Sequence, residues 1–576
     1  PPLDGGARAE PARLTAPGAG VSDEAIHALW EKSEGVPLFI EEYLDMAADA
    51  TSRGKGLDIE AIPLTMNNLI QGKLDLLDAD ARRFVQTASA LGRTFDVEVV
   101  RNVSALNEDS VAASARLLVE RKLAVSDRRE AGRTTYSFTH ALVRDAVYAS
   151  MGRRPRQEMH SKIAAHLTSR GEAGSIGEEI IADHLRRAGR LGEAAEKFLS
   201  AAITAAGAGN AGEALAHLED GLNTISEMPA GNERDGFELQ LRTIQAPTQM
   251  VTRGPGNPDF GATLVKVREL MDRLDSRENI VPIVYNTALH EWAMANLERA
   301  ENTARELMAI NHQEPSDSAY LAANTMQGLI AWHQGKNSLA RSSLTATVQR
   351  YDPAIHRDLY NLFLKEFGVF GFFYLGLTET VLGNLDVGAQ RAAEAMKVAE
   401  IVQRPHAFGF SLLANFAPAM LRGDVETADR YSEQSLAFAE NQGFPEFAAM
   451  SKFCRGWVAC QKAQADVGLP LMAEGAAQWD ATGFAAWQPI FAALEARCLV
   501  KQGDYDAAAR LLDKYDARVM ATGELQAHAP LLLARAELSG ALGRTDEADQ
   551  LARSARDIAA AQEANLWLDQ INAAFS

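Results

Sequence analysis

The sequence has few cysteines, no excess of positive charge and no long apolar run. Three cysteines occur in 576 residues, Cys454, Cys460 and Cys498, and none forms a CxxC pair. An odd number without paired spacing predicts neither a disulfide framework nor a zinc site, and it fits a reducing cytoplasm. The formal net charge of -20 opposes loose attraction to nucleic acid. The longest apolar stretches, 367–378 and 405–421, are too short or too interrupted by Gly, Asn and Pro to cross a bilayer.

Motifs that carry chemistry are missing as well. The sequence holds no GxxxxGK[ST] loop to cradle phosphates, and no HExxH, GxSxG or EF-hand pattern. His160, His166 and His184 are spaced so that they build no metal-ligand face, which predicts packing or surface roles. The residues by themselves therefore predict no catalytic site and no metal site. The chain opens PPLDGG, without Met or a signal sequence, so we expect its start to be the middle of a longer polypeptide.

What the sequence does contain is a pattern that returns every 40 residues. The tripeptides LGN, RGD, KAQ, QGD and LGR place a Gly or Ala at 383, 423, 463, 503 and 543, and small residues follow five positions later, at Gly388, Ala428, Gly468, Ala508 and Ala548. Gly ends a helix at little cost because it adopts positive φ, and a small residue lets the next helix cross closely. Each period thus predicts an antiparallel helix pair, and stacked pairs indicate a tetratricopeptide-like α-solenoid.

The pattern is less regular upstream. Gly189, Gly209 and Gly335 begin similar units, but the step from Gly335 to Gly383 is 48 residues rather than 40. We expect the extra residues to form a longer connection around residues 351–356.

The N-terminal part follows a different pattern. Residues 1–21 are rich in Pro, Gly and Ala and predict a loop, with helices from Ser22 onward. Further helices are expected at 64–77, 79–91, near 110–121 and at 141–151. Between the last two, alternating apolar residues predict strand, confined to a hairpin at 122–140. Three helices and a small hairpin predict a winged-helix domain at 61–152.

A winged helix admits a DNA-binding interpretation, because residues 121–134 carry five basic side chains against two acidic ones. The alternative is a solvated hairpin in a domain that contacts protein or nucleotide. The acidic composition of the whole chain favours this second interpretation, so we expect no nucleic-acid partner.

Several stretches carry a resemblance to a known family. SEGVPLFIEE (33–42), the segment 74–96 and YSFTHALVRDAVY (136–148) resemble, in order and spacing, the lid and winged-helix region of signal-transduction ATPases with numerous domains, the STAND class of AAA-like ATPases. Downstream, YDP (351–353), QGFP (442–445), RGW (455–457) and WDATG (479–483) resemble the tetratricopeptide-like region of bacterial members that often follow a class III adenylate cyclase domain. The resemblance runs from about residue 22 to the C-terminus and implies lid helices at 22–60 and a helical array at 153–576.

The resemblance implies a nucleotide site to which this chain contributes only in part. Gly35 and Pro37 are similar to the family's GxP motif, whose proline packs near the adenine. His140 stands where related ATPases place the histidine of their MHD motif, near the β-phosphate of ADP, although Ala141 follows it in place of Asp. The alternative roles are structural: a helix-start proline, and a histidine held at a helix N-terminus by Thr139 and backbone. The P-loop and Walker B acid are expected upstream, so ATP or ADP is implied for the full-length parent and no cofactor for this chain.

The sequence as a whole predicts a mostly α protein, with a small winged-helix domain followed by a tetratricopeptide-like α-solenoid. With the resemblance, we expect it to form the regulatory region of a STAND-type ATPase. The expected partners are a protein or peptide on the concave face of the array and the upstream nucleotide-binding domain of the same polypeptide. A protein is favoured over a small metabolite because no convergent cluster of titratable residues is evident. The parent would be an adenylate cyclase or a LuxR-type transcription activator. A free-standing repeat scaffold and an enzyme are the alternatives.

Overall fold

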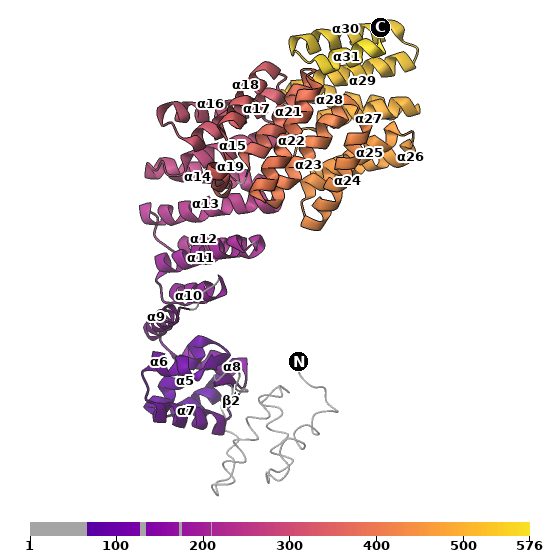
Figure 1. Ribbon diagram of the computed structural model, residues 1–576. Coiled ribbons are helices and arrows are strands. Elements are labelled where there is room, and N and C mark those ends of the chain that lie inside the picture. Colours follow the sequence, from indigo (N-terminus) through magenta and orange to yellow (C-terminus); the bar gives the residue numbers. More distant parts are fainter. Residues whose placement is uncertain (1–65, 127–133, 172–174, 209, 364, 576) are drawn as a thin grey trace, which may run out of the picture. The chain divides into compact units, whose positions relative to one another are not determined.

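A computed structural model describes residues 66–126, 134–171, 175–208, 210–363 and 365–575 (Figure 1). The expected loop at 1–21 and the expected lid helices at 22–60, with Gly35 and Pro37, lie outside the described residues. The chain divides into two compact units, Pro1–Ala201 and Ala202–Ser576, and each is described by itself.

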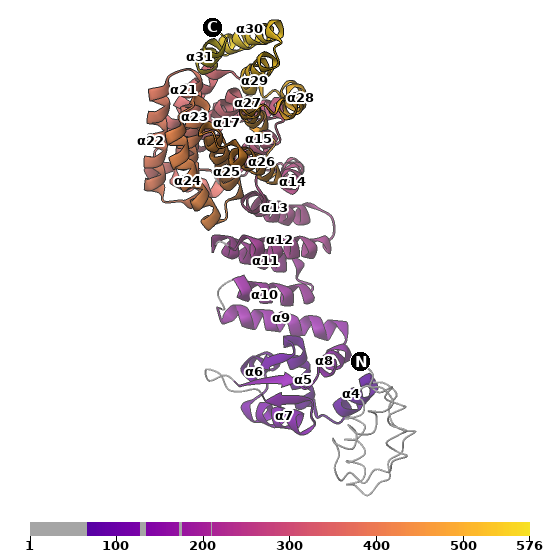
Figure 2. The same cartoon turned by 90° about the vertical axis from the view of Figure 1, so that its right-hand side faces the viewer.

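The first unit combines helices with one small sheet (Figure 2). Its described helices are α4 (Met66–Asp75), α5 (Ala79–Leu91), α6 (Val97–Ser104), α7 (Glu108–Glu120), α8 (Ala141–Ser150), α9 (Arg153–Ser169), α10 (Ser175–Arg187) and the first part of α11 (Leu191–Gly207). The strands β1 (Thr94–Asp96), β2 (Ala124–Ser126) and β3 (Thr135–Phe138) form an antiparallel sheet in the order β1-β3-β2.

Local sequence explains why α5 forms and what it buries. The carboxylate of Asp78 caps the helix by accepting a hydrogen bond from the N–H of Ala81 at 2.8 Å. The apolar face of α5 includes Phe84, whose ring lies edge-on to Phe95 of β1 with centroids 6.0 Å apart. Phe95 in turn contacts Phe138 of β3 at 5.3 Å. One aromatic cluster therefore joins the helix to the sheet.

The sheet has one strand more than the expected hairpin. β1 pairs with β3, with Phe95 opposite Tyr136, so the expectation that strand is confined to 122–140 is wrong. The helix α6 was not expected either. Three residues are too few to show an alternating pattern, and only the pairing with β3 makes this segment a strand. The winged-helix assignment stays a prediction, although the helices and the hairpin on which it rests are present.

The second unit is helical throughout its described residues. After α12 (Ala211–Ser226), α13 (Asn232–Arg253) and α14 (Pro258–Leu274) come α15 (Ile280–Ala293), α16 (Leu297–Gln313), α17 (Asp317–His333), α18 (Asn337–Arg350), α19 (Pro353–His356), η1 (Arg357–Leu359) and α20 (Tyr360–Phe363). The regular repeats follow: α21 (Phe367–Val381), α22 (Leu385–Val402), α23 (Pro405–Arg422), α24 (Val425–Gln442), α25 (Pro445–Gln461), α26 (Ala465–Ala481), α27 (Gln488–Gln502), α28 (Tyr505–Thr522), η2 (Leu525–Ala527), α29 (His528–Ala541), α30 (Thr545–Ala561) and α31 (Asn565–Ala574). The fold is mostly α and tetratricopeptide-like, as predicted.

The 40-residue period of the sequence is the period of the turns. The residues at 383, 423, 463, 503 and 543 all have positive φ, with values of 87°, 83°, 59°, 81° and 75°. A second set lies midway between them and also has positive φ: Gln403, Gly443, Gly483, Gly523 and Glu563. A left-handed residue thus ends each helix of this stretch, which confirms the expected helix pairs.

The turn glycines give a matched test of backbone strain. A Cβ on Gly423 or Gly503 would meet no atom within 4 Å, so any cost of Gly423→Val or Gly503→Val comes from the positive φ alone. We expect each to lose roughly 1–2 kcal/mol of unfolding free energy. Ala463 already bears this strain at φ 59°, so Ala463→Gly is expected to gain roughly 0.5–1 kcal/mol. Urea unfolding followed by circular dichroism measures all three, and equal stabilities would contradict the turn assignment.

The small residues after the turns let neighbouring helices cross closely, as expected. A Cβ on Gly388 would lie 2.5 Å from Oγ1 of Thr380, and a Cβ on Gly468 would lie 2.6 Å from the carbonyl oxygen of Gly456. Real Cβ contacts are not this short, so glycine is required at both positions. The alanines at the same place in the other repeats are buried: Ala428, Ala508 and Ala548.

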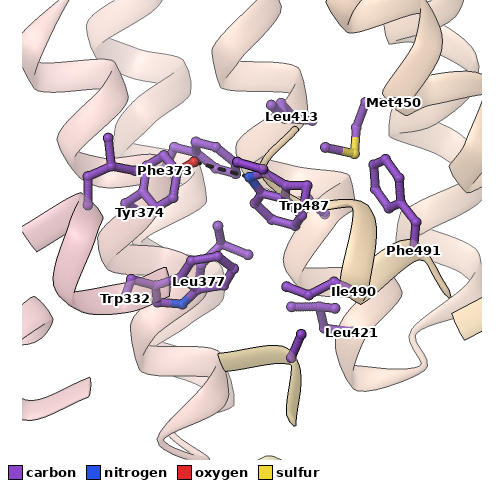
Figure 3. Packing of buried hydrophobic residues seen from close by; sticks show 14 of the residues in the cluster. Trp332, Phe373, Tyr374, Leu377, Leu413, Leu421, Met450, Trp487, Ile490 and Phe491 are labelled. Atoms are coloured by element: carbon purple, nitrogen blue, oxygen red, sulfur yellow. Dashed lines mark hydrogen bonds between the residues drawn. The ribbon is translucent and has the colours of Figure 1, made fainter. Parts of the chain in front are cut away.

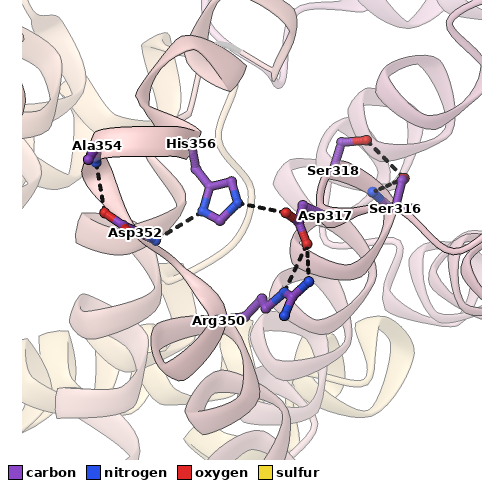
Figure 4. Close-up of polar contacts among 8 residues, drawn as sticks. Ser316, Asp317, Ser318, Arg350, Asp352, Ala354 and His356 are labelled. Atoms are coloured by element: carbon purple, nitrogen blue, oxygen red, sulfur yellow. Dashed lines mark hydrogen bonds and ion pairs between the residues drawn. The ribbon is translucent and has the colours of Figure 1, made fainter.

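The 48-residue step in the pattern contains the expected extra connection, folded as α19, η1 and α20. Its His356 accepts from the N–H of Asp352 at 2.9 Å through Nδ1, and its Nε2 lies 3.1 Å from the carboxylate of Asp317 on α17 (Figure 4). Arg350 donates to the same carboxylate at 2.8 and 2.5 Å. Hydrogen bonds from His356 and Arg350 hold the pKa of Asp317 below its usual value. The connection is thereby fixed to the array.

Repeats far apart in sequence contact one another. The N–H of Ala485 donates to the carbonyl oxygen of Ala293 at 2.7 Å. In the apolar core, the indole Nε1 of Trp487 donates to the hydroxyl of Tyr374 at 3.2 Å (Figure 3). The later repeats thus close back on the earlier ones. The period does not predict these contacts, because it defines each helix pair but not the rotation from one pair to the next.

Candidate functional site in the helical array

The second unit contains a cavity of about 1190 Å³. Its walls come from α13 and the turn after it, from α15, α20, α21, α23 and the end of α24, and from α25 and α26 with their flanking turns. Early and late repeats both contribute, so the cavity follows from the way the array closes on itself. Pockets of this size hold small molecules in other proteins, and the lining residues decide which ones.

Aromatic side chains form much of the wall. Phe373 and Tyr374 come from α21, and Trp479 and Phe484 stack at the end of α26 with ring centroids 4.7 Å apart. The indole Nε1 of Trp479 donates to a backbone carbonyl at 2.8 Å, that of Ala486. Burial raises the pKa of Tyr374, so its hydroxyl stays neutral. This part of the wall therefore presents apolar ring faces and edges to the cavity.

One lysine lies in this apolar surrounding. The side chain of Lys365, just before α21, is only 6 % exposed. Its Nζ lies 4.6 Å from the ring centroid of Phe410 and 5.5 Å from that of Phe370, distances at which a cation is attracted to the ring. Burial lowers the pKa of Lys365 to about 8, against the opposing charge of Glu446, so the ammonium form still predominates at neutral pH.

A histidine and a glutamate lie beside the lysine in the same wall. Nε2 of His406, on α23, is 3.5 Å from Oε1 of Glu446, on α25. Burial, and then the charge of Lys365, lower the pKa of His406. Burial alone would raise the pKa of Glu446, but the hydrogen bond and charge of His406, together with the backbone N–H of Glu446 and the charge of Lys365, hold that pKa below its usual value. The cavity thus contains a buried lysine and a carboxylate that is already engaged.

This cluster corrects the expectation that no titratable residues converge. His406 and Glu446 stand forty residues apart, each directly after a proline, Pro405 and Pro445, that begins a helix. Residues one period apart occupy equivalent places in stacked repeats, so the pair could have been found by aligning the repeats on those prolines. Lys365 comes forty-one residues before His406, but its burial depends on the irregular connection and could not have been read from the period.

The structure places His140 at the start of α8, in the first unit. It is the N-cap residue, half-buried, with an extended backbone and no side-chain capping hydrogen bond. The hydroxyl of Thr139 does not hold it, since that hydroxyl donates to the carbonyl oxygen of Lys122 at 2.7 Å. The imidazole of His140 is therefore not used to cap α8. Gly35 and Pro37, its expected companions at a nucleotide, lie outside the described residues.

Other site chemistry is absent from the part of the chain that the structure describes. No group of three His, Cys, Asp or Glu side chains there could hold a metal ion. None of the helices described combines the length and apolar character that crossing a bilayer requires. His160 and His184 contact one another in the first unit, with their Nδ1 atoms 2.8 Å apart, which agrees with the expected packing roles.

Comparison with known proteins gives a distant relative and several structures of similar fold. No family model matches the chain. A protein of Rhizobium meliloti, described as uncharacterized, is 23% identical over 547 residues, which cover 92% of this chain and 52% of that protein. The chain thus spans about half the length of this relative.

Among solved structures, a STAND protein with a tetratricopeptide repeat sensor from Pyrococcus horikoshii is similar over 98% of this chain and 73% of its own, with 12% identity and a TM-score of 0.43. A Rap protein complexed with Competence and Sporulation Factor is similar over 64% of this chain and 99% of its own, with 14% identity and a TM-score of 0.46. These likenesses concern the fold.

Proposed function

We propose that this chain is the regulatory and protein-interaction region of a cytoplasmic STAND-type signalling ATPase. The observation that carries the proposal is the segment YSFTHALVRDAVY, which folds as β3 followed by α8 with His140 at the junction. An imidazole that does not cap its own helix is available to contact a nucleotide. The helical array that follows offers the extended surface on which such proteins bind a protein or peptide partner. The effector of the parent would be an adenylate cyclase domain or a LuxR-type DNA-binding domain.

The nucleotide site of the parent would be completed by the upstream domain. Backbone amides and the lysine of a P-loop supply most of the affinity for ADP, and the lid proline and His140 add a closing contact. One or two such contacts contribute on the order of 1–3 kcal/mol. Micromolar binding requires roughly 8 kcal/mol. The chain alone is therefore expected neither to bind ATP or ADP at micromolar concentration nor to hydrolyse it.

Two measurements test this assignment. Calorimetric titration of the present chain with ADP is expected to show no micromolar binding. In the polypeptide extended upstream through its P-loop, His140→Ala is expected to speed ADP release about tenfold or more, the loss of one charge-assisted contact. The matched control is His312→Ala, which removes an exposed histidine of α16 in the second unit and should leave ADP release unchanged.

The outcomes separate the alternatives. Micromolar ADP binding to the present chain would mean that the nucleotide site is misplaced. Equal ADP release from the wild type and His140→Ala would leave His140 as a helix-start histidine and remove the main support for a STAND parent. In the second case the array would stand as a free scaffold.

A further inference from the structure

Lys365 is a buried cation without an anionic partner in the described part of the chain. No other lysine or arginine described by the structure is buried to this degree. The rings of Phe370 and Phe410 lie beside its Nζ, and among the described residues no carboxylate lies within ion-pair distance. Glu446 acts on it only at longer range and contacts His406 instead. A buried ammonium is costly unless an anion compensates it, and Lys365 lines the cavity where such an anion can arrive.

The rest of the wall limits the charge of that anion. A single ammonium balances a single negative charge. Glu446 and Glu440 also line the cavity and would repel a dianion such as a phosphate monoester. Two further cations of the lining are already paired, Lys452 with Glu474 at 2.8 Å and Arg253 with Asp259. A monocarboxylate is therefore the anion that fits.

The wall also restricts the size and polarity of the group that carries the carboxylate. Phe373, Trp479 and Phe484 present rings to the cavity, and such rings favour aromatic or long aliphatic groups over polar ones. The volume of about 1190 Å³ exceeds that of a single amino-acid side chain several times. The occupant is thus larger than acetate and mostly apolar.

We propose that this cavity binds an apolar monocarboxylate, whose carboxylate pairs with Lys365 and whose body packs on the aromatic wall. This site goes beyond the function proposed above and does not depend on a STAND parent or on any nucleotide. The array would then bind a small molecule in addition to a protein partner.

Matched ligands test the charge requirement on the full chain. The probes are decanoate and indole-3-acetate, each compared with its neutral counterpart, decanol and indole-3-acetamide. Binding is followed by calorimetry and by tryptophan fluorescence, because Trp292, Trp479 and Trp487 line the cavity. We expect each acid to bind about tenfold to a hundredfold more tightly than its neutral counterpart, the usual ratio for one charge-assisted hydrogen bond.

Three variants locate the interaction. Lys365→Met keeps the length and the apolar stem of the side chain, and it is expected to abolish the preference for the acid. Lys452→Met is the matched control, since that lysine also lines the cavity but is paired with Glu474, and it should leave the preference intact. Glu446→Gln removes the repelling charge and should tighten binding of the acids. Circular dichroism confirms that each variant is folded.

Opposite results would overturn the proposal. The first is equal affinity for each acid and its neutral counterpart. The second is an unchanged preference for the acid in folded Lys365→Met. The third is no saturable binding of either acid at millimolar concentration. A short peptide with an apolar C-terminal residue is the last probe, used with a free and an amidated carboxyl group. Tighter binding of the free form than of both small acids, lost in Lys365→Met, would support the site and identify a peptide C-terminus as the source of the carboxylate.

Discussion

Replacing Gly475 by alanine is expected to destabilise the second unit by about 3 kcal/mol. Gly475 lies on α26, where it faces α25 at a close helix crossing. A Cβ there would lie 2.5 Å from the backbone nitrogen of Phe453 and 2.8 Å from the carbonyl oxygen of Ala449. Both atoms belong to the backbone of a buried helix and cannot turn aside as a flexible side chain can. The helices would have to separate, and buried apolar surface would be lost along their length.

Gly236→Ala provides the matched control for this substitution. Gly236 also lies within a helix, α13, but a Cβ there would meet nothing within 4 Å. Alanine is better than glycine in a helix by roughly 0.5–1 kcal/mol, so this variant should be more stable than the wild type. Urea unfolding followed by circular dichroism measures both. Similar stabilities of the two variants would show that α25 and α26 are not in such close contact.

The second large effect is a loss of stability of the first unit in acid. His160 of α9 and His184 of α10 are buried, with their Nδ1 atoms 2.8 Å apart, and Nε2 of His160 lies 2.8 Å from the hydroxyl of Tyr148 on α8. Neutral rings satisfy this chain, because Tyr148 can donate to one ring and that ring to the next. If both rings are protonated, two N–H donors face each other.

The direction of the pH dependence follows from the two pKa values. Burial first, and then neighbouring positive charges including Arg187, lower the pKa of both histidines from 6.5 to about 4, with Asp183 opposing. Between these values the unfolded chain binds more protons than the folded chain, so stability is complete above pH 6.5 and falls as the pH falls towards 4. Each shift corresponds to about 3 kcal/mol. For the pair as a whole we expect a loss of about 3 kcal/mol of unfolding free energy, because the two facing rings can share one proton.

The experiment compares stability at pH 7 and pH 4.5 by hydrogen exchange of the amides of α9 and α10. Carboxylates also begin to titrate in this range, so the informative quantity is the difference between the wild type and His160→Asn/His184→Asn. The double variant should lose most of the pH dependence of these two helices. His312→Asn, at an exposed position, should keep it. An unchanged pH dependence in the double variant would show that the pair is not the acid-sensitive group.

The periodic elements were the parts most open to prediction. The helix at 79–91 and the five turns from Gly383 to Gly543 stand where the sequence places them. Local rules explain why: Asp78 caps a helix, Gly423 adopts positive φ, and an apolar stripe must be buried against the next pair. The second set of turns has the same period, but positions such as Gln403 and Glu563 lack the glycine that would have indicated them.

The candidate site, like two other features of the fold, depends on contacts between segments that lie apart in the sequence. β1 is a strand only because β3 lies beside it, and the tight crossing at Gly475 is required only because α25 lies against it. Lys365 looks like any surface lysine in the sequence, and it becomes a buried cation because the closing array surrounds it with rings. The sequence by itself determined the helix pairs, since caps, turns and apolar stripes act within a few residues. The tertiary structure decided the cavity, because small rotations between successive pairs add up and bring residues together that stand far apart in the chain.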